Sequence, residues 1–504
     1  MKFYLDLFSG ETLPGKFNLA INWIKANTVK GKGIKITSQR PNNELYPEVT
    51  GYFIPSLLNW GERDLALQNG RWLLSIQNPD GSWSDPTGET SYTFDTGQIL
   101  KGLLALAEDH PEFQEPIIHG CDWILAQIEE NGRVTTPDAS SWVLPNNRVV
   151  PEAIHLYSLQ PLKEAGVRWG NNKYCEAVEK ALAYYLKMEE LTEFNTLSHF
   201  HAYIIEALID LGCTELAEAS MEIIAKYQNK RGAVPAYPDV KWVCSTGLFQ
   251  YALIWYKLGN TDRADRAFKY ACRLQNKTGG FYGSYGFGAN YFPKEEISWA
   301  VKYFLDSFFW KVKSSFNNEV ASFSESIDET DGRYQLIAKI VDREGLKKIL
   351  DIGCGKGRYI TKLKSRKPQI EAYGVDISEQ MLKNLPEDIM GIQGSLLNMP
   401  FKDKSFDLGY CVEALEHAVN VPGAIREMCR LIKDAGTLII IDKNKEKHGK
   451  LKLSDWEQWY SEGQILELLR NEGFKVEVYR NVPYDNKDGT DGLFLAWVAK
   501  KAGL

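Results

Sequence analysis

The chain has 504 residues, of which 44% are hydrophobic and 25% are charged, and its formal net charge is −7. This composition is typical of a globular protein, and the length predicts two or three domains. The negative charge and the lack of a long basic run argue against general attraction to nucleic acid or to an anionic membrane.

The first residues carry no apolar leader, since Asp6 and Glu11 interrupt them, and no window of the chain is long enough and apolar enough to span a bilayer. The eight cysteines stand singly, without a Cys-x-x-Cys pair. This argues against a zinc site and favours a reducing compartment. We therefore expect a cytoplasmic enzyme without membrane insertion and without a bound metal.

Residues 50 to 310 contain an internal repeat. A helix ends in glutamine and is followed by a polar turn with glycine, and amphipathic stretches separate the copies. Apolar residues at helical spacing on both segments of a unit predict stacked helical hairpins, with the glycine turns as helix stops. The copies lie at Gln77 with Gly81, Gln127 with Gly132, Gln228 with Gly232, and Gln275 with Gly279.

These Gln-x-x-x-Gly endings resemble the repeats of terpene cyclases and protein prenyltransferases, and more broadly those of α/α toroids such as polysaccharide lyases and uronate epimerases. The resemblance implies an all-α domain, an α/α toroid over residues 1–317, whose helical hairpins enclose a cavity. The Asp-x-Asp-Asp acid of a class II terpene cyclase and the zinc ligands of a prenyltransferase are both missing from the sequence. We therefore expect a toroid that binds or modifies a glycan.

Polar and aromatic residues at the helix starts are candidates for the toroid's substrate site. Aromatic rings beside carboxylates suit sugar rings, although packing between helices is the alternative role for such rings. His199 and His201 point in different directions on a helix, so they do not form a metal pair. One of them, together with Glu48 or a tyrosine, would act as a general base, and a capping or hydrogen-bonded structural histidine is the alternative. The candidates are Glu48, Asp95, His199, His201, Trp242 and Tyr285.

The stretches 313–319 and 322–329 are polar and predict a linker, which places the domain boundary near residue 318. An amphipathic helix over Gly332 to Arg343 then precedes an apolar strand.

A glycine-rich turn, Asp351 to Gly357, follows that strand and opens a helix that begins at Arg358. Glycines let a backbone approach a ligand closely, and a helix start offers unpaired N–H groups to it. A second strand follows and ends in Asp376, where a carboxylate can accept both ribose hydroxyls of a nucleoside. A nicotinamide fingerprint would need glycine at the position of Arg358.

Three further stretches follow the glycine-rich turn and Asp376: Gln393 to Ser395, Ser405 to Tyr410 and Leu415 to His417. In the order and spacing of these motifs, the last third of the chain resembles the class I S-adenosylmethionine-dependent methyltransferases. The resemblance implies an α/β Rossmann-like domain with a seven-stranded sheet over residues 318–504, and S-adenosyl-L-methionine as the methyl donor. It implies the following contacts: Asp351, Gly353 and Gly355 around the methionine end, Asp376 at the ribose, and Ile377 and Leu396 on either side of the adenine. The family usually has an acid at the position of Ser395, whose hydroxyl can still accept a bond from the adenine amino group.

The acceptor side of the methyl transfer centres on Glu416 and His417, just past the fourth strand of the sheet, while Asp442 and Lys443 end the fifth. An alcohol acceptor needs its proton removed, and His417 is the expected base because its unperturbed pKa lies near neutrality. A role of the pair in packing and orienting the loop is the alternative.

We expect the methyl acceptor to be a hydroxyl of a sugar or glycan intermediate, a small molecule or glycan that the toroid also binds or modifies. Two alternatives stay open: the toroid is a non-catalytic module that recruits the substrate, or it handles an isoprenoid or lipid acceptor.

Overall fold

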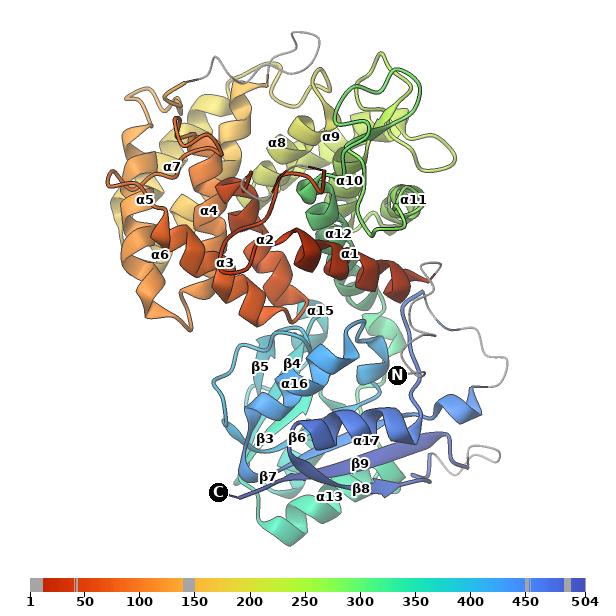
Figure 1. Cartoon of the computed structure of the whole chain (residues 1–504). Helices are drawn as coiled ribbons and strands as arrows, with labels where there is room; N and C mark the ends of the chain where they lie inside the picture. Colours follow the sequence, from red (N-terminus) through yellow and green to blue (C-terminus); the bar gives the residue numbers. More distant parts are fainter. Residues whose placement is uncertain are drawn as a thin grey trace. The chain divides into compact units, whose positions relative to one another are not determined.

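The structure is a computed structural model that describes residues 12–39, 41, 44–138, 150–448, 453, 455–484 and 491–503. The chain divides after Lys311 into two compact units. Gly15–Leu58 and Glu62–Lys311 form the first, and Val312–Leu504 forms the main part of the second. Helices make up most of the first unit, and the second is built around a sheet (Figure 1).

The helices of the first unit are of two kinds, which alternate along most of the chain. The inner helices are buried on nearly all sides, because they are apolar almost all round, except for α6 (Leu159–Trp169), which buries one face only. The outer helices bury one face only. The inner segments are α2 (Pro47–Asn59), α4 (Thr93–Leu106), η4 (Glu152–Ser158) with α6 (Leu159–Trp169), α8 (Ser198–Asp210), α10 (Ser245–Lys257) and α12 (Ser298–Asn318). The outer helices are α1 (Leu13–Asn27), α3 (Arg63–Ser75), α5 (Gln114–Ala126), α7 (Asn172–Tyr185), α9 (Thr214–Tyr227) and α11 (Thr261–Cys272).

Each of the repeated glycine turns follows an outer helix, leads into the next inner segment and packs against the next outer helix. Their glycines have φ near +95°, and each lies against a backbone carbonyl of the following outer helix. A Cβ atom on Gly232 would lie 2.0 Å from the carbonyl oxygen of Arg266 in α11. A side chain therefore does not fit there, and the left-handed backbone adds a second reason for glycine.

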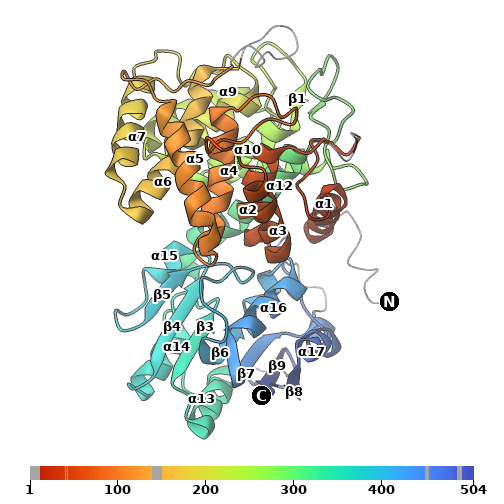
Figure 2. The same cartoon turned by 60° about the vertical axis from the view of Figure 1, so that its left-hand side comes forward.

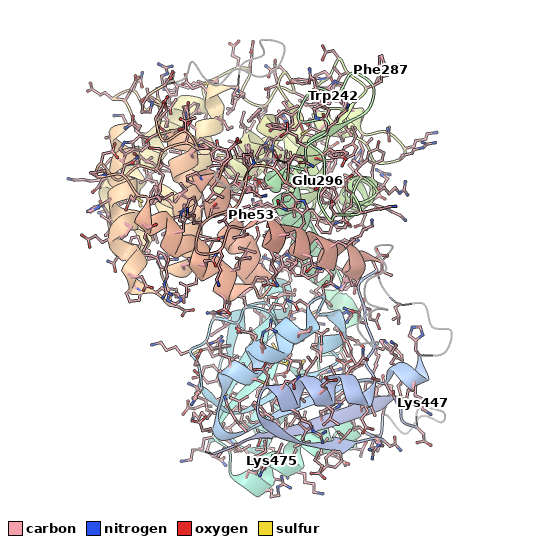
Figure 3. The ribbon with its side chains drawn as sticks, viewed as in Figure 1. Phe53, Trp242, Phe287, Glu296, Lys447 and Lys475 are labelled. Carbon is pink, nitrogen blue, oxygen red and sulfur yellow. The ribbon has the colours of Figure 1, made fainter. Side chains whose placement is uncertain are left out.

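The last turn of the series meets the first helix. A Cβ atom on Gly279 would lie 2.1 Å from the carbonyl oxygen of Leu19 in α1, and Gln275 Nε2 donates to the carbonyl of Lys16 at 2.9 Å. Glu296, labelled in Figure 3, adds a buried contact, since Trp23 Nε1 donates to its carboxylate at 2.7 Å. The chain thus returns to its own beginning, and Figures 1 and 2 show the inner helices gathered within the outer ones.

The predicted linker over 313–319 is wrong for most of its length, because α12 continues to Asn318. Val312 and Ser314 are buried, so tertiary packing holds in a helix a segment whose polar composition favoured a loop. Mostly exposed residues follow, including the short η5 (Val320–Ser322), up to α13 (Gly332–Glu344). The carboxylate of Asp331 caps α13 by accepting the N–H groups of its first two residues after Gly332.

The second unit contains a seven-stranded sheet in the order β5-β4-β3-β6-β7-β9-β8. All neighbours from β5 to β7 pair in parallel, and β9 is antiparallel to both β7 and β8. This mixed sheet confirms the Rossmann-like part of the predicted fold. The strands are β3 (Lys348–Ile352), β4 (Glu371–Asp376), β5 (Met390–Gln393), β6 (Phe406–Val412), β7 (Ile432–Lys443), β8 (Phe474–Tyr479) and β9 (Phe494–Lys501).

Helices cover both faces of this sheet. α13 and α14 (Arg358–Arg366) share one apolar core with the strands, while α16 (Val421–Leu431) and α17 (Glu462–Asn471) lie together on the other side (Figure 2). The order of strands reverses between β3 and β6, and ligands of such sheets bind outside the carboxyl ends of the strands at that point. The glycine turn after β3 lies there, as does the short η6 (Leu415–His417) after β6.

Candidate cofactor and acceptor site

The glycine turn between β3 and α14 is shaped by three left-handed residues. Gly353, Gly355 and Gly357 have φ of 71°, 53° and 77°. A Cβ atom on Gly353 would lie 2.4 Å from the Cβ of Ala414, so close packing requires that glycine. A Cβ atom on Gly355 would meet nothing within 4 Å. The space beside Gly355 is therefore open, as a turn that carries a ligand requires.

Asp376 ends β4 and ties the turn to the next strand. Its Oδ2 accepts the N–H of Gly355 at 2.8 Å, and its Oδ1 accepts the N–H of Ser378 at 2.8 Å. Burial raises the pKa of Asp376, although these two backbone bonds and the nearby His417 oppose the shift. Each carboxylate oxygen keeps capacity for a further bond, so the residue can accept two ribose hydroxyls.

Asp351, in β3, has an unmet hydrogen-bonding need. It is 2% exposed, and burial raises its pKa to about 7. Its Oδ2 has no hydrogen-bond partner among the described residues. Tyr410 and Arg358 oppose the shift, but a buried carboxylate oxygen without a partner is still costly, and the ammonium group of an amino acid would supply one. The residue therefore fits the methionine end of S-adenosyl-L-methionine.

The three side chains predicted around the adenine lie close to the turn in sequence or space. Ile377 follows Asp376 directly, and a Cβ on Gly353 would lie 4.0 Å from Leu396 Cδ1. Ser395 Oγ already accepts the N–H of Leu397 at 3.2 Å, which leaves it one further acceptor position. All three are half-buried, and their contacts with the adenine stay predictions.

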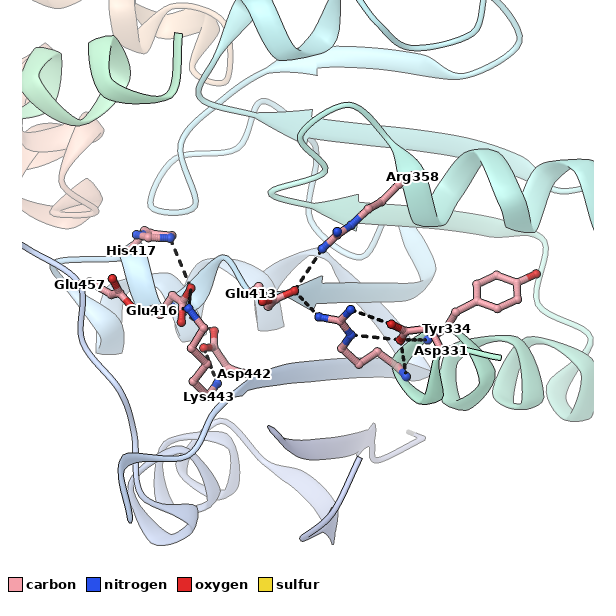
Figure 4. A network of polar contacts seen from close by, with 10 residues as sticks. Asp331, Tyr334, Arg358, Glu413, Glu416, His417, Asp442, Lys443 and Glu457 are labelled. Carbon is pink, nitrogen blue, oxygen red and sulfur yellow. Dashed lines mark hydrogen bonds and ion pairs between the residues drawn. The ribbon is translucent and has the colours of Figure 1, made fainter. Parts of the chain in front are cut away.

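Glu416 and His417 form the centre of a polar network in η6 (Figure 4). Glu416 Oε1 lies 3.4 Å from His417 Nε2 and accepts a bond from Lys443 Nζ at 2.8 Å. Burial would raise the pKa of Glu416, but His417 and Lys443 together hold it below its usual value. Glu416 is therefore an ionised carboxylate that positions His417, and a proton acceptor of its own only at low pH.

Asp442, near the end of β7, stabilises this loop through hydrogen bonds to its backbone. Its carboxyl accepts the backbone N–H of Glu416 at 3.0 Å and that of Lys443 at 2.7 Å. Burial and the charge of Glu416 raise the pKa of Asp442 well above the usual range.

His417 has one nitrogen left for chemistry. Its Nδ1 is buried without a hydrogen-bond partner among the described residues, and its ring packs edge-on against Phe316 at 5.1 Å. The histidine also lies near enough to Asp376 to lower that residue's pKa. The predicted base and the predicted ribose ligand therefore lie near each other.

Sequence reasoning missed a second ionic network at this edge of the sheet. Glu413, with φ of 52°, follows β6 and pairs with both Arg333 of α13 and Arg358 of α14 (Figure 4). Arg333 is 2% exposed and also pairs with Asp331 at 2.7 Å. No local signal marks this set, because its members come from three separate elements.

In the first unit, the structure brings Glu48 and Asp95 together. They lie in the first turns of α2 and α4, are buried, and interact electrostatically. His199, in the first turn of α8, belongs to the same region, since its ring lies 4.7 Å from that of Tyr203, which Glu48 also influences.

The other three candidates of the first unit have partners elsewhere. His201 bonds to the hydroxyl of Tyr251 at 3.0 Å and to the carbonyl of Thr192 at 3.2 Å. The hydroxyl of Tyr285 donates to the carbonyl of Leu274 at 2.8 Å and accepts the N–H of Tyr282 at 2.7 Å, so it stabilises a turn. Trp242 is buried and packs against Tyr237 with ring centroids 5.8 Å apart.

Among the residues that the structure describes, no helix meets the length and apolarity needed to cross a bilayer, and no group of three or more His, Cys, Asp or Glu side chains is arranged to hold a metal ion.

Comparisons with known proteins agree with this site. Residues 350–440 match the family described as a methyltransferase domain. An uncharacterized protein of Methanocaldococcus jannaschii is 32% identical over 27% of this chain and 58% of its own length. The demethylmenaquinone methyltransferase of Roseiflexus sp. is 27% identical over 31% of this chain and 66% of its own, and the sterol 24-C-methyltransferase ERG6B of Gibberella zeae is 30% identical over 23% and 33%.

The chain thus spans a third to two thirds of the length of these relatives, and the similarity falls in its last third. The methyltransferase-domain match and the named methyltransferases imply S-adenosyl-L-methionine as the methyl donor, which confirms the predicted cofactor. Residues 350–440 are thus similar to the domain of S-adenosylmethionine-dependent methyltransferases.

Proposed function

We propose that the protein transfers a methyl group from S-adenosyl-L-methionine to a hydroxyl of a sugar or glycan. The observation that carries the methyltransferase part is the joint arrangement of the open turn at Gly355, the Asp376 carboxylate bonded to that turn, and His417 near that carboxylate. When bound, S-adenosyl-L-methionine would supply an electrophilic methyl group, whose bond to sulfur breaks as the bond to the acceptor oxygen forms, with S-adenosylhomocysteine as the leaving group.

The residues of the chain would divide the work. Asp376 binds the ribose and Asp351 the ammonium group, which fixes the donor in place, and positioning is the main requirement of an in-line displacement. His417 accepts the proton of the acceptor hydroxyl. Glu416, held ionised by Lys443, orients the imidazole and stabilises its positive charge once the proton has arrived.

We further propose that the first unit is an α/α toroid that binds the same acceptor. The return of the last glycine turn to α1 supports a closed ring of hairpins, and the buried Glu48 and Asp95 support a polar ligand. A role of the unit as a recruitment module without chemistry is equally consistent with these contacts.

A second candidate acceptor is an isoprenoid compound, because the named relatives act on a demethylmenaquinone and on a sterol. A comparison of methyl transfer to separate acceptors distinguishes the sugar acceptor from the isoprenoid acceptor. The full chain is incubated with the donor and either neutral oligosaccharides or a reduced naphthoquinone, and S-adenosylhomocysteine is quantified. Formation with an oligosaccharide supports the sugar acceptor, formation with the naphthoquinone alone supports the isoprenoid, and formation with neither contradicts both.

A further inference from the structure

The inner face of the first unit carries its side chains in layers along the helix axes. On α8, His199, Tyr203 and Glu206 are spaced four and three residues apart and therefore share one face. The ring centroids of His199 and Tyr203 lie 4.7 Å apart, and Glu206 accepts a bond from Tyr157 of η4 at 3.1 Å. Along this face, polar His199 near the helix N-terminus is followed by aromatic Tyr203 and then by charged Glu206.

The middle of this arrangement is a layer of tyrosines from four inner segments. The ring of Tyr203 lies 4.8 Å from that of Tyr157 and 5.9 Å from that of Tyr303, which in turn lies 6.4 Å from Tyr52. We call these four residues the tyrosine layer. Because the rings contact one another across the helices, they separate the two polar groups on either side.

The polar group on the C-terminal side of the tyrosine layer is fully paired. Lys257 Nζ lies 2.9 Å from a carboxylate oxygen of Glu206 and 3.0 Å from one of Asp210, and Lys101 approaches Asp210 at 3.4 Å. Burial opposes ionisation, yet the two lysines hold the pKa of Asp210 below its usual value. Each buried charge has an opposite neighbour, so this group, which we call the paired layer, is structural.

The polar group on the N-terminal side is different, although it is equally buried. It comprises Glu48, Asp95, His199 and Gln250, which we call the open layer. Lys302 lowers the pKa of Glu48 electrostatically, but its ammonium group pairs with Asp306 at 2.9 Å. Burial nevertheless raises the pKa of Asp95 to about 7 and that of Glu48 well above its usual range. Burial of carboxyl groups without a cation destabilises the fold, which makes the contrast with the paired layer informative.

Two atoms of the open layer lack a partner among the described residues. Asp95 Oδ2, on a residue that is 4% exposed, accepts no hydrogen bond. Gln250 is fully buried, and its Oε1 accepts a bond from His199 Nδ1 at 2.7 Å, but its Nε2 donates to nothing. Native proteins leave few such atoms, and those that occur are commonly reserved for a ligand or for chemistry.

We propose that the open layer is a second ligand site, which binds a neutral polyhydroxylated ligand such as a sugar ring. A hydroxyl group both donates and accepts, so a ligand that carries several hydroxyls can donate to the carboxyl of Asp95 with one and accept the amide N–H of Gln250 with another. A cationic ligand would pair with the acids but would offer no acceptor to Gln250 Nε2.

This inference rests on the proposed function in one respect only, the sugar nature of the acceptor, and the site is independent of the methyl donor. It is therefore tested on the full chain without the donor, so that a failure here is separate from a failure of methyl transfer. Maltotetraose, cellotetraose and chitotetraose are titrated by calorimetry, with spermidine as the cationic probe.

The matched variants are Asp95→Asn in the open layer and Asp210→Asn in the paired layer. We expect one of the tetrasaccharides to bind, Asp95→Asn to weaken it about tenfold, which corresponds to one hydrogen bond, and Asp210→Asn to leave it unchanged. The absence of tetrasaccharide binding, binding of spermidine alone, or equal binding by Asp95→Asn would each overturn the proposal.

Thermal unfolding gives a readout that needs no ligand. At pH 8, Asp95 is ionised in both states but buried without a cation in the folded one, so Asp95→Asn should raise the melting temperature. Asp210→Asn should lower it, because it leaves the two lysines of the paired layer without their partner. A lower melting temperature for both variants would mean that Asp95 also serves the fold, and would overturn the assignment of the open layer.

Discussion

Replacing Asp376 by alanine is the sharpest perturbation of the cofactor site. The carboxylate accepts the N–H groups of Gly355 and Ser378 at 2.8 Å each, and it has capacity for two ribose hydroxyls. Hydrogen bonds to a charged group contribute about 1.5–3 kcal/mol each, so the loss of two would cost about 3–6 kcal/mol of binding free energy. At about 1.4 kcal/mol per factor of ten, the Kd for S-adenosyl-L-methionine should rise about 10²- to 10⁴-fold.

Asp407 provides the matched control. It lies at the start of β6, where its carboxylate accepts the N–H groups of Lys347 and Lys348 at 3.2 and 2.9 Å. Asp407→Ala therefore removes two comparable backbone bonds from the opposite end of the same sheet. It should lower the stability of the unit by about 1–3 kcal/mol and leave the Kd unchanged within about twofold.

Isothermal titration of both variants and of the unaltered chain measures the difference, and circular dichroism checks that each variant is folded. If folded Asp376→Ala binds S-adenosyl-L-methionine within about threefold of the unaltered chain, the ribose assignment is wrong. A loss of affinity in Asp407→Ala as large as in Asp376→Ala would mean that the effect comes through the sheet rather than through the carboxylate.

Three further predictions follow from the same site. A Cβ atom on Gly355 or on Gly345 would meet no atom within 4 Å, and the two glycines have similar φ, 53° and 60°. Gly355→Ala and its control Gly345→Ala should therefore both lower the free energy of unfolding by about 1–2 kcal/mol. Calorimetry should find weaker donor binding only for Gly355→Ala. Burial raises the pKa of Asp351 to about 7, and the Asp351 carboxyl binds an ammonium group better once the carboxyl is ionised. Donor affinity should therefore rise between about pH 5.5 and 7 and level off above. Asp351→Asn should abolish this rise. His417→Gln should lower kcat about 10²- to 10⁴-fold with donor affinity nearly unchanged; an unaltered kcat would assign His417 to packing.

The raised pKa of Asp351 also fixes the sign of its effect on stability. Its pKa is higher in the folded state than in the unfolded chain, so the folded state binds more protons between about pH 4 and 7. This contribution is present in full below the unfolded pKa and is lost as the pH rises through 7. Asp351→Asn should therefore flatten the pH dependence of the melting temperature over that interval.

The parts of the structure that depend on local sequence could be predicted. The turn from Asp351 to Gly357, the helix that begins at Arg358 and the strand that ends in Asp376 are all where the pattern placed them, because glycines with positive φ and buried strands leave strong signals. The repeat glycines of the first unit were found for the same reason, although their contact with the next outer helix was not foreseen.

The parts that depend on contacts between distant elements could not be predicted. Glu413 is an unremarkable acid in the sequence, and only the fold brings Arg333 and Arg358 to it. His199 and His201 were indistinguishable as candidates, whereas the structure directs one toward Gln250 and the other toward Tyr251. Burial, which raises the pKa of Asp351 and of Asp95, is likewise a property of the assembled fold.

The most direct test of the central claim is a calorimetric titration of the full chain with S-adenosyl-L-methionine, repeated in the presence of saturating S-adenosylhomocysteine. The site described here predicts one equivalent of donor bound per chain and competition by the product. Absence of binding at about 1 mM donor, which corresponds to less than about 4 kcal/mol of binding free energy, would contradict it.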